Sequence, residues 1–163
     1  MKTEVLNENQ IMRICNRFAF QILENSNDFD DIHLIGIKEK GFEVAKIIEN
    51  ELKLISNKNI CLNSIKINKK NPKDPVSSDI NLKTKYKTIF LIDDVLNTGK
   101  TLTYSLSFLL KFNFKSIKTL VLIDRNHKEF PIKVDYKGIS LSTNIDDNIK
   151  LVNDKKNLKA VLF

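Results

Sequence analysis

Hydrophobic positions follow a helical period in three segments of the chain. The first segment starts after Asn7, which forms a capping-box pattern with Gln10. Its apolar residues are Ile11, Ile14, Cys15, Phe18 and Ile22. Further segments cover about residues 42–54 and about residues 99–112. Because apolar residues three and four apart share one helix face, these segments predict amphipathic helices.

Short apolar runs rich in β-branched residues separate these helices. They occupy residues 32–37, 60–67, 88–92 and 117–123. Runs of this kind are typical of strands buried on both faces, and strands that alternate with helices form parallel sheets. The predicted fold class is therefore α/β, with three layers and a mostly parallel central sheet flanked by helices. The tail from Tyr136 onward alternates weakly and predicts a short edge hairpin or strand.

Residues 68–86, "NKKNPKDPVSSDINLKTKY", lack a regular hydrophobic period. They contain two prolines and five lysines, and in a compact domain a loop of this length is usually functional or disordered. We expect a flexible lid here, within a single domain that covers residues 1–163.

Composition and charge narrow the possible surroundings and partners. Hydrophobic residues make up 42% of the 163 residues, and no apolar run approaches the roughly 20 residues of a membrane helix. The polar N-terminal stretch also lacks a secretory signal, so we expect a cytoplasmic protein with no membrane partner. The net charge of +7 suits a polyanionic partner such as RNA or a phosphorylated substrate, while compositional bias is an alternative source for part of the lysine excess.

The cysteines and histidines predict no disulfide framework and no metal cluster. Cys15 and Cys61 lie far apart in apolar stretches, where free thiols usually pack as small buried side chains. His33 and His127 are the only histidines in the sequence. We therefore expect both thiols to be buried in the core.

Three polar segments follow predicted strands: "GIKEKG", "DDVLNTGKT" and "DRNHKE". Open parallel sheets bind ligands beyond the carboxyl ends of their strands, so these segments should meet at one edge. Asp93 and Asp94 repel each other and need water, cations or hydroxyl donors. Just beyond them, the residues from Asn97 to Thr101 can present free backbone N–H groups at a helix start. A ribose 5-phosphate satisfies both halves of such a site.

Other interpretations of this segment are weaker. A phosphate-binding P-loop needs a glycine five residues before Gly99, where Asp94 stands. A response-regulator receiver carries its acidic pair early in the chain. A purely structural Asp-Asp turn leaves the adjoining anion site without a purpose.

The segment "IFLIDDVLNTGKTL" resembles the phosphoribosyl pyrophosphate (PRPP) signature of the type I phosphoribosyltransferases. Within that family, the chain is most similar to the pyrimidine-operon attenuation regulators that double as uracil phosphoribosyltransferases. "LIGIKEKGFEVAKII" resembles their pyrophosphate loop, and "LVLIDRNHKEFPIKVDYKG" resembles their C-terminal segment. The resemblance implies the type I fold with a small irregular hood.

The resemblance also implies roles for particular residues. Asp93 and Asp94 would hold the ribose hydroxyls and, with Lys40, form the catalytic set. The PRPP-binding loop would comprise Asp93, Asp94, Val95, Leu96, Asn97, Thr98, Gly99, Lys100 and Thr101. The pyrophosphate loop would comprise Lys38, Glu39, Lys40 and Gly41, with a cis peptide bond near Lys38. Magnesium ion (Mg2+) would be held mainly by substrate oxygens, with no protein ligand assigned.

The implied reaction is displacement of pyrophosphate from ribose C1 by a nucleobase nitrogen. Asn97 stands where purine-specific members carry an acid, which favours uracil. Asp124 and Arg125 would lie beside the base, or Arg125 would form a surface ion pair with Asp124 or Asp135. Asn126 stands where the family has glycine, and "INKK" followed by "NPKDP" replaces the family's lid sequence.

The regulator resemblance raises two further expectations. Arg17 stands where an RNA-contacting arginine is expected, or it is a solvated charge on a helix face. The assembly would be a homodimer or homotetramer. The alternative function is a nucleotide-sensing, RNA-binding transcription attenuator with weak or no enzymatic activity.

Overall fold

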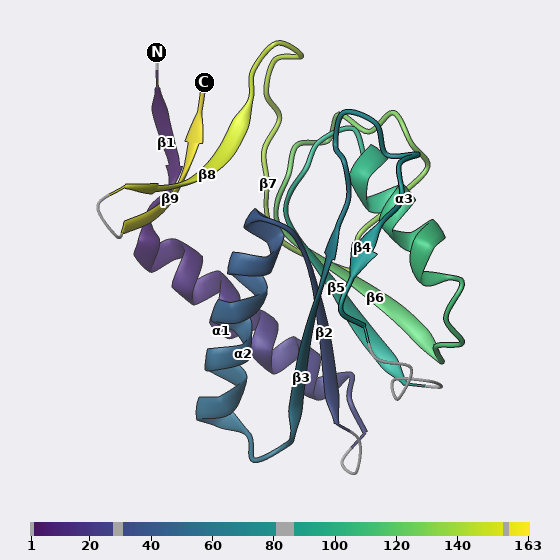
Figure 1. Ribbon diagram of the computed structural model, residues 1–163. Coiled ribbons are helices and arrows are strands. Elements are labelled where there is room, and N and C mark those ends of the chain that lie inside the picture. The colour runs from purple at the N-terminus through teal and green to yellow at the C-terminus, as the bar shows by residue number, and fades with distance from the viewer. Residues whose placement is uncertain (1, 28–30, 81–86, 155–156) are drawn as a thin grey trace.

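The computed structural model describes residues 2–27, 31–80, 87–154 and 157–163. Its centre is a sheet of six strands in the order β4-β3-β2-β5-β6-β7 (Figure 1). The strands are β2 (Ile32–Ile37), β3 (Ile60–Lys66), β4 (Ser77–Ser78), β5 (Thr88–Leu96), β6 (Ser116–Asp124) and β7 (Tyr136–Ser140). All neighbouring strands pair in parallel except β4, which is antiparallel to β3. The mostly parallel sheet predicted from the sequence is confirmed.

Helices cover both faces of this sheet. In Figure 1, α1 (Glu8–Glu24) and α2 (Lys40–Ile55) lie on one face, and α3 (Lys100–Leu109) lies on the other. The capping box of Asn7 and Gln10 is present, with both hydrogen bonds at 2.9 Å. The three-layer arrangement is therefore confirmed.

Alternate residues of the buried strands supply two apolar clusters. Leu34, Phe90 and Leu120 pack in the cluster beneath α1 and α2, whereas Ile35 and Leu91 pack in the cluster beneath α3. Since successive side chains of a strand point to opposite faces, a strand buried on both faces needs apolar residues at every position. This explains the unbroken apolar runs in the sequence.

A second, three-stranded antiparallel sheet forms the hood above the carboxyl ends of the main strands (Figure 1). Its order is β1-β9-β8, with β1 (Thr3–Leu6), β8 (Ile149–Asp154) and β9 (Asn157–Leu162). Both ends of the chain lie on this sheet. The tail forms the expected hairpin, but the hood is more regular than expected because β1, which the sequence did not predict, pairs with β9.

Some element bounds differ from those predicted. β5 continues through the acidic pair to Leu96, because Val95 and Leu96 still pair with β6. α3 ends at Leu109, earlier than expected, and turns follow it. The predicted lid contains the short strand β4, while residues 81–86 of that lid lie outside the described residues. None of the helices in the described ranges combines the length and apolar character that a membrane crossing requires.

Candidate functional site

A cavity of about 490 Å³ opens at the carboxyl ends of β5 and β6, beneath the hood. Its lining comes from the end of β5, the start of α3, the first turn of α2, the loop after β3 and the hood strand β8. The lining residues are Lys40, Lys69, Asp93, Asp94, Val95, Leu96, Asn97, Thr98, Gly99, Lys100, Thr101, Leu102, Arg125, Ile149, Lys150 and Leu151. Every predicted PRPP-loop residue is therefore brought to one cavity.

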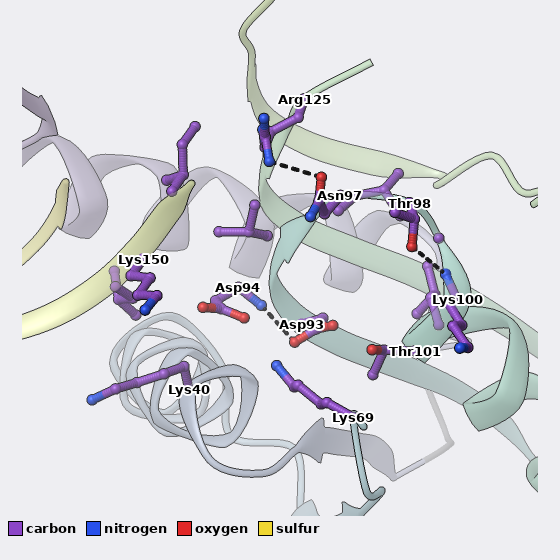
Figure 2. A pocket seen from close by; sticks show the side chains of 16 residues that line it. Lys40, Lys69, Asp93, Asp94, Asn97, Thr98, Lys100, Thr101, Arg125 and Lys150 are labelled. Carbon is purple, nitrogen blue, oxygen red and sulfur yellow. Dashed lines mark hydrogen bonds between the residues drawn. The ribbon is translucent and has the colours of Figure 1, made fainter. Parts of the chain in front are cut away.

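The acidic pair lies in the middle of this cavity (Figure 2). Asp93 is 4% exposed and Asp94 is 7% exposed, and the Asp94 backbone N–H donates to Asp93 Oδ1 at 2.9 Å. Burial and the neighbouring charge of Asp94 raise the pKa of Asp93 well above its ordinary value, and Lys69 partly opposes this shift. A ligand that brings hydroxyl donors or positive charge would therefore stabilise the two buried carboxylates.

The start of α3 presents backbone N–H groups beside the acidic pair. Gly99 adopts a left-handed conformation with φ of 84°, which lets the chain turn sharply into the helix. Within the described ranges, no hydrogen bond engages the backbone N–H groups of Gly99, Thr101 or Leu102, whereas that of Lys100 donates to Thr98 Oγ1 at 3.3 Å. Free N–H groups at a helix N-terminus bind anions, so this loop can accept a phosphate group.

Lysines from three separate segments line the cavity: Lys40, Lys69 and Lys150. In Figure 2 the amino groups of Lys69 and Lys150 lie beside the acidic pair, whereas that of Lys40 points away from it. Lys40 Nζ also forms an ion pair with Glu43 Oε1 at 3.0 Å. Reasoning from the sequence missed Lys150 and did not single out Lys69. Neither residue belongs to a motif, and both reach the site only through tertiary folding.

Only Lys40 of the predicted pyrophosphate loop lines the cavity. The peptide bond between Lys38 and Glu39 is cis, as the resemblance implied. Gly41 packs behind the site, where a Cβ atom would lie 2.7 Å from Ile92 O and 2.8 Å from Asp93 Cα. Gly41 therefore allows α2 to approach the backbone of β5 closely.

Arg125 is a buried cavity residue, only 2% exposed. Its Nη1 donates to Asn97 Oδ1 at 2.8 Å, and its Nη2 donates to Thr143 Oγ1 at 2.8 Å and to Asn144 O at 3.0 Å. Among the described residues Arg125 forms no ion pair, so the surface ion pair that the sequence left open is excluded there.

Asp124 does not line the cavity, although the sequence placed it beside the base with Arg125. Its Oδ1 accepts the Asn126 backbone N–H at 2.9 Å, and its Oδ2 lies 3.4 Å from Lys137 Nζ. Asn126 adopts a left-handed φ of 58°, a conformation that asparagine tolerates better than most residues. Asn126 can therefore form the turn for which the family uses glycine.

Arg17, the predicted RNA contact, is exposed on α1 and also has a structural partner. Its Nη2 donates to the backbone carbonyls of Lys137 at 3.1 Å and Gly138 at 2.9 Å. Arg17 thus connects α1 to the edge strand β7, a contact that neither sequence interpretation included.

Magnesium is the metal that the family resemblance implies. It prefers oxygen ligands, and Asp93 and Asp94 supply carboxylate oxygens in a cavity that also presents free backbone N–H groups. The residues present fit the ion, and these two carboxylates would help to hold it together with oxygens of a bound substrate.

Comparison with known proteins gives a consistent result. Residues 1–155 match the family model described as "Phosphoribosyl transferase domain". Relatives named "Bifunctional protein PyrR" include those of Haemophilus ducreyi, 32% identical over 93% of this chain and 89% of the relative, and Pediococcus pentosaceus, 32% identical over 93% and 92%.

Solved structures agree on the fold. The hypoxanthine phosphoribosyltransferase of Trypanosoma cruzi matches with a TM-score of 0.78 at 15% identity, over 97% of this chain and 95% of that one. A hypoxanthine-guanine phosphoribosyltransferase from Bacillus anthracis matches with a TM-score of 0.77 at 16% identity, over 98% and 96%. Together with the family model and the relatives at 32% identity, the site geometry leads to one conclusion: this chain belongs to the phosphoribosyltransferase family.

Proposed function

We propose that this phosphoribosyltransferase transfers the phosphoribosyl group of PRPP to uracil and releases pyrophosphate. The observation that carries the proposal is one cavity that combines a buried carboxylate pair with free N–H groups at a helix start. These features complement the two chemically different ends of a ribose 5-phosphate: its vicinal hydroxyls and its phosphate.

The geometry supports two binding subsites along the cavity, one for the ribose and one for the 5-phosphate. Asp93 and Asp94 would accept hydrogen bonds from the ribose hydroxyls, while the N–H groups of Gly99, Thr101 and Leu102 would bind the 5-phosphate. With both ends held, ribose C1 has a fixed position relative to the attacking base.

The leaving pyrophosphate needs positive charge. In the reaction, a base nitrogen forms a bond to C1 as the bond from C1 to the pyrophosphate oxygen breaks, and the nitrogen loses its proton to solvent. Lys40, Lys69 and Lys150 surround the cavity and would stabilise the developing negative charge. Magnesium, when bound with PRPP, adds charge that offsets the pyrophosphate.

Uracil is favoured as the acceptor because of Asn97 and Arg125. Asn97 offers no carboxylate to a purine ring. Among the described residues, the bonds of Arg125 to Asn97, Thr143 and Asn144 leave one Nη1 N–H, which suits a carbonyl oxygen at the same end of the cavity. The resemblance of the sequence to the pyrimidine-operon regulators that double as uracil phosphoribosyltransferases supports the same choice.

A panel of bases tests this proposal. Purified protein with PRPP and magnesium is incubated separately with uracil, hypoxanthine, guanine and orotate, and nucleoside monophosphates are quantified. We expect product with uracil and at most a small fraction of that rate with the other bases. Turnover with a purine but not with uracil would contradict the assignment of the base.

A second candidate is a nucleotide-sensing RNA attenuator, favoured by the net charge of +7. It would use the same cavity to sense a nucleotide and would bind RNA elsewhere. Nucleotide-dependent RNA binding without turnover of any base would support it over the enzyme. Specific RNA binding should weaken steeply as salt concentration rises, because phosphate contacts release counterions.

The proposal extends to a cytoplasmic homodimer or homotetramer. Size-exclusion chromatography with light scattering measures the mass directly, and a monomeric mass at assay concentration would contradict this part.

A further inference from the structure

Three potential metal ligands meet at the edge of the sheet opposite the cavity: Asp31, His33 and Cys61. Their ligand atoms, a carboxylate oxygen, an imidazole nitrogen and a thiol sulfur, all lie within 4.8 Å of one another. This cluster could not be predicted from the sequence, because Cys61 lies 28 residues beyond His33 and belongs to no recognisable metal motif.

The strand register brings the cluster together. His33 and Cys61 are directly paired residues near the starts of the parallel strands β2 and β3. Paired residues of neighbouring strands point to the same face, and Asp31 immediately precedes β2. The cluster therefore rests on the rigid start of the sheet, at the lower ends of β2 and β3 in Figure 1.

The exposure of the three residues differs in a useful way. His33 is 5% exposed, Cys61 is partly exposed and Asp31 is exposed. Cys61 thus departs from the expectation that both thiols are buried in the core. An ion can reach this cluster from solvent while the imidazole holds it against the sheet.

We propose that Asp31, His33 and Cys61 form a binding site for a borderline transition-metal dication, with zinc as the natural occupant. Thiolate and imidazole ligands select zinc over magnesium, which prefers oxygen ligands. Tetrahedral zinc needs ligand atoms about 3.5 Å apart, so the cluster closes by roughly 1 Å through side-chain rotation. Water supplies the fourth ligand on the exposed side.

Binding changes the charge balance at the cluster. Burial and the nearby Asp31 raise the pKa of the Cys61 thiol, so without metal Cys61 is neutral. On binding, the thiol proton leaves to solvent as the sulfur–metal bond forms, so that one thiolate and one carboxylate balance the dication. Asp31 and Lys115 line the same small hollow.

The site would act on stability and not on transfer chemistry. It ties β2 to β3 at the end of the sheet opposite the cavity, and a metal that binds only the folded chain raises its melting temperature. Rates with magnesium and PRPP should not depend on whether this cluster is loaded.

Cobalt spectroscopy tests the proposal directly. The chelator-treated full chain is titrated with Co2+ under reducing conditions, in excess Mg2+ so that carboxylate sites are occupied. We expect a near-ultraviolet thiolate-to-cobalt band, strong visible bands of tetrahedral cobalt, and loss of both when zinc is added. Wild-type protein that shows neither band would overturn the proposal.

Variants assign the ligands. Cys61→Ser should abolish the thiolate band, Asp31→Asn should weaken binding about tenfold or more, and Cys15→Ala should leave the spectrum unchanged. Asp31 is exposed, so Asp31→Asn keeps the test valid if Cys61→Ser fails to fold. A thiolate band that persists in Cys61→Ser, or unchanged affinity in Asp31→Asn, would contradict the site.

Discussion

Asp93 shows how strongly a buried position can change one carboxyl group. Its pKa lies well above the ordinary value of 3.8, first because burial penalises the charged form and second because Asp94 repels it. Between the pKa of Asp93 in the unfolded chain and its higher pKa in the folded chain, the folded chain therefore keeps a proton on Asp93 that the unfolded chain has released. The contribution of Asp93 to the free energy of unfolding is fully present at low pH. It is lost as pH rises from the pKa of Asp93 in the unfolded chain through its pKa in the folded chain.

Asp93→Asn should raise the melting temperature of the ligand-free protein at neutral pH. Asparagine keeps an acceptor for the Asp94 N–H but removes the buried charge. The gain should shrink as pH falls and vanish below the unfolded pKa, where wild-type Asp93 is protonated in both states. Melting curves from about pH 4 to about pH 8 measure this, with exposed Asp146→Asn as the charge-matched control. A pH-independent difference would contradict the account.

Asn97 is the residue that separates pyrimidine from purine use in this account. In Asn97→Asp, the new carboxylate would bind the Arg125 guanidinium, which already lies 2.8 Å from the Asn97 side chain. We expect no gain of hypoxanthine turnover. We also expect about a tenfold loss in kcat/KM for uracil, because the hydrogen bond from Arg125 to the base would be weakened and a hydrogen bond from a charged donor contributes about 1.5–3 kcal/mol. The base panel measures both values, and efficient hypoxanthine turnover would contradict this role of Arg125.

At the scale of elements, the contact between α2 and β5 positions the acidic pair. Gly41→Ala would place a Cβ atom 3.0 Å from Asp93 Oδ1 and closer still to the β5 backbone. We expect a loss of about 1–3 kcal/mol in unfolding free energy, because backbone cannot move aside as a flexible side chain can. Activity should fall further than stability alone explains, since β5 carries Asp93.

Denaturant unfolding and uracil turnover together check the Gly41 prediction. Asn50→Ala, an exposed change on the same helix, should alter unfolding free energy by less than about 0.5 kcal/mol. Equal stability and activity of Gly41→Ala and wild type would show that α2 does not constrain β5.

The main elements were predictable because their patterns are local. Helical spacing around Phe18 and the apolar run at Leu34 each describe packing that the segment itself encodes. β1 was missed because a four-residue strand gains its stability from pairing with β9 at the far end of the chain. The extension of β5 past Asp94 likewise depends on its partner β6.

The residues of the site likewise fall into those that local sequence predicts and those that only folding brings together. The acidic pair and the loop around Gly99 form one continuous motif, so their meeting was predictable. Lys69 and Lys150 come from the loop after β3 and from the hood, and only the folded chain brings them to the pocket. The burial of Arg125 depends on acceptors from two other segments, which no local pattern reveals.

At the scale of the whole molecule, the topology brings the side chains of the candidate site to the carboxyl-terminal edge of the main sheet. The adjacent order β2-β5-β6 brings three strand ends together, and the hood sheet closes over them (Figure 1). The cavity is thus assembled from segments between Lys40 in α2 and Leu151 in the hood strand β8. The proposed function depends above all on binding of the PRPP ribose by the Asp93–Asp94 pair.

Calorimetric titration of PRPP with magnesium into wild type, Asp94→Asn and the control Asp146→Asn tests that claim most directly. Circular dichroism first verifies that all three proteins are folded. Losing a charged acceptor for a hydroxyl should weaken binding about tenfold or more in Asp94→Asn, whereas Asp146→Asn should bind like wild type. Equal affinity of folded Asp94→Asn and wild type would contradict the account.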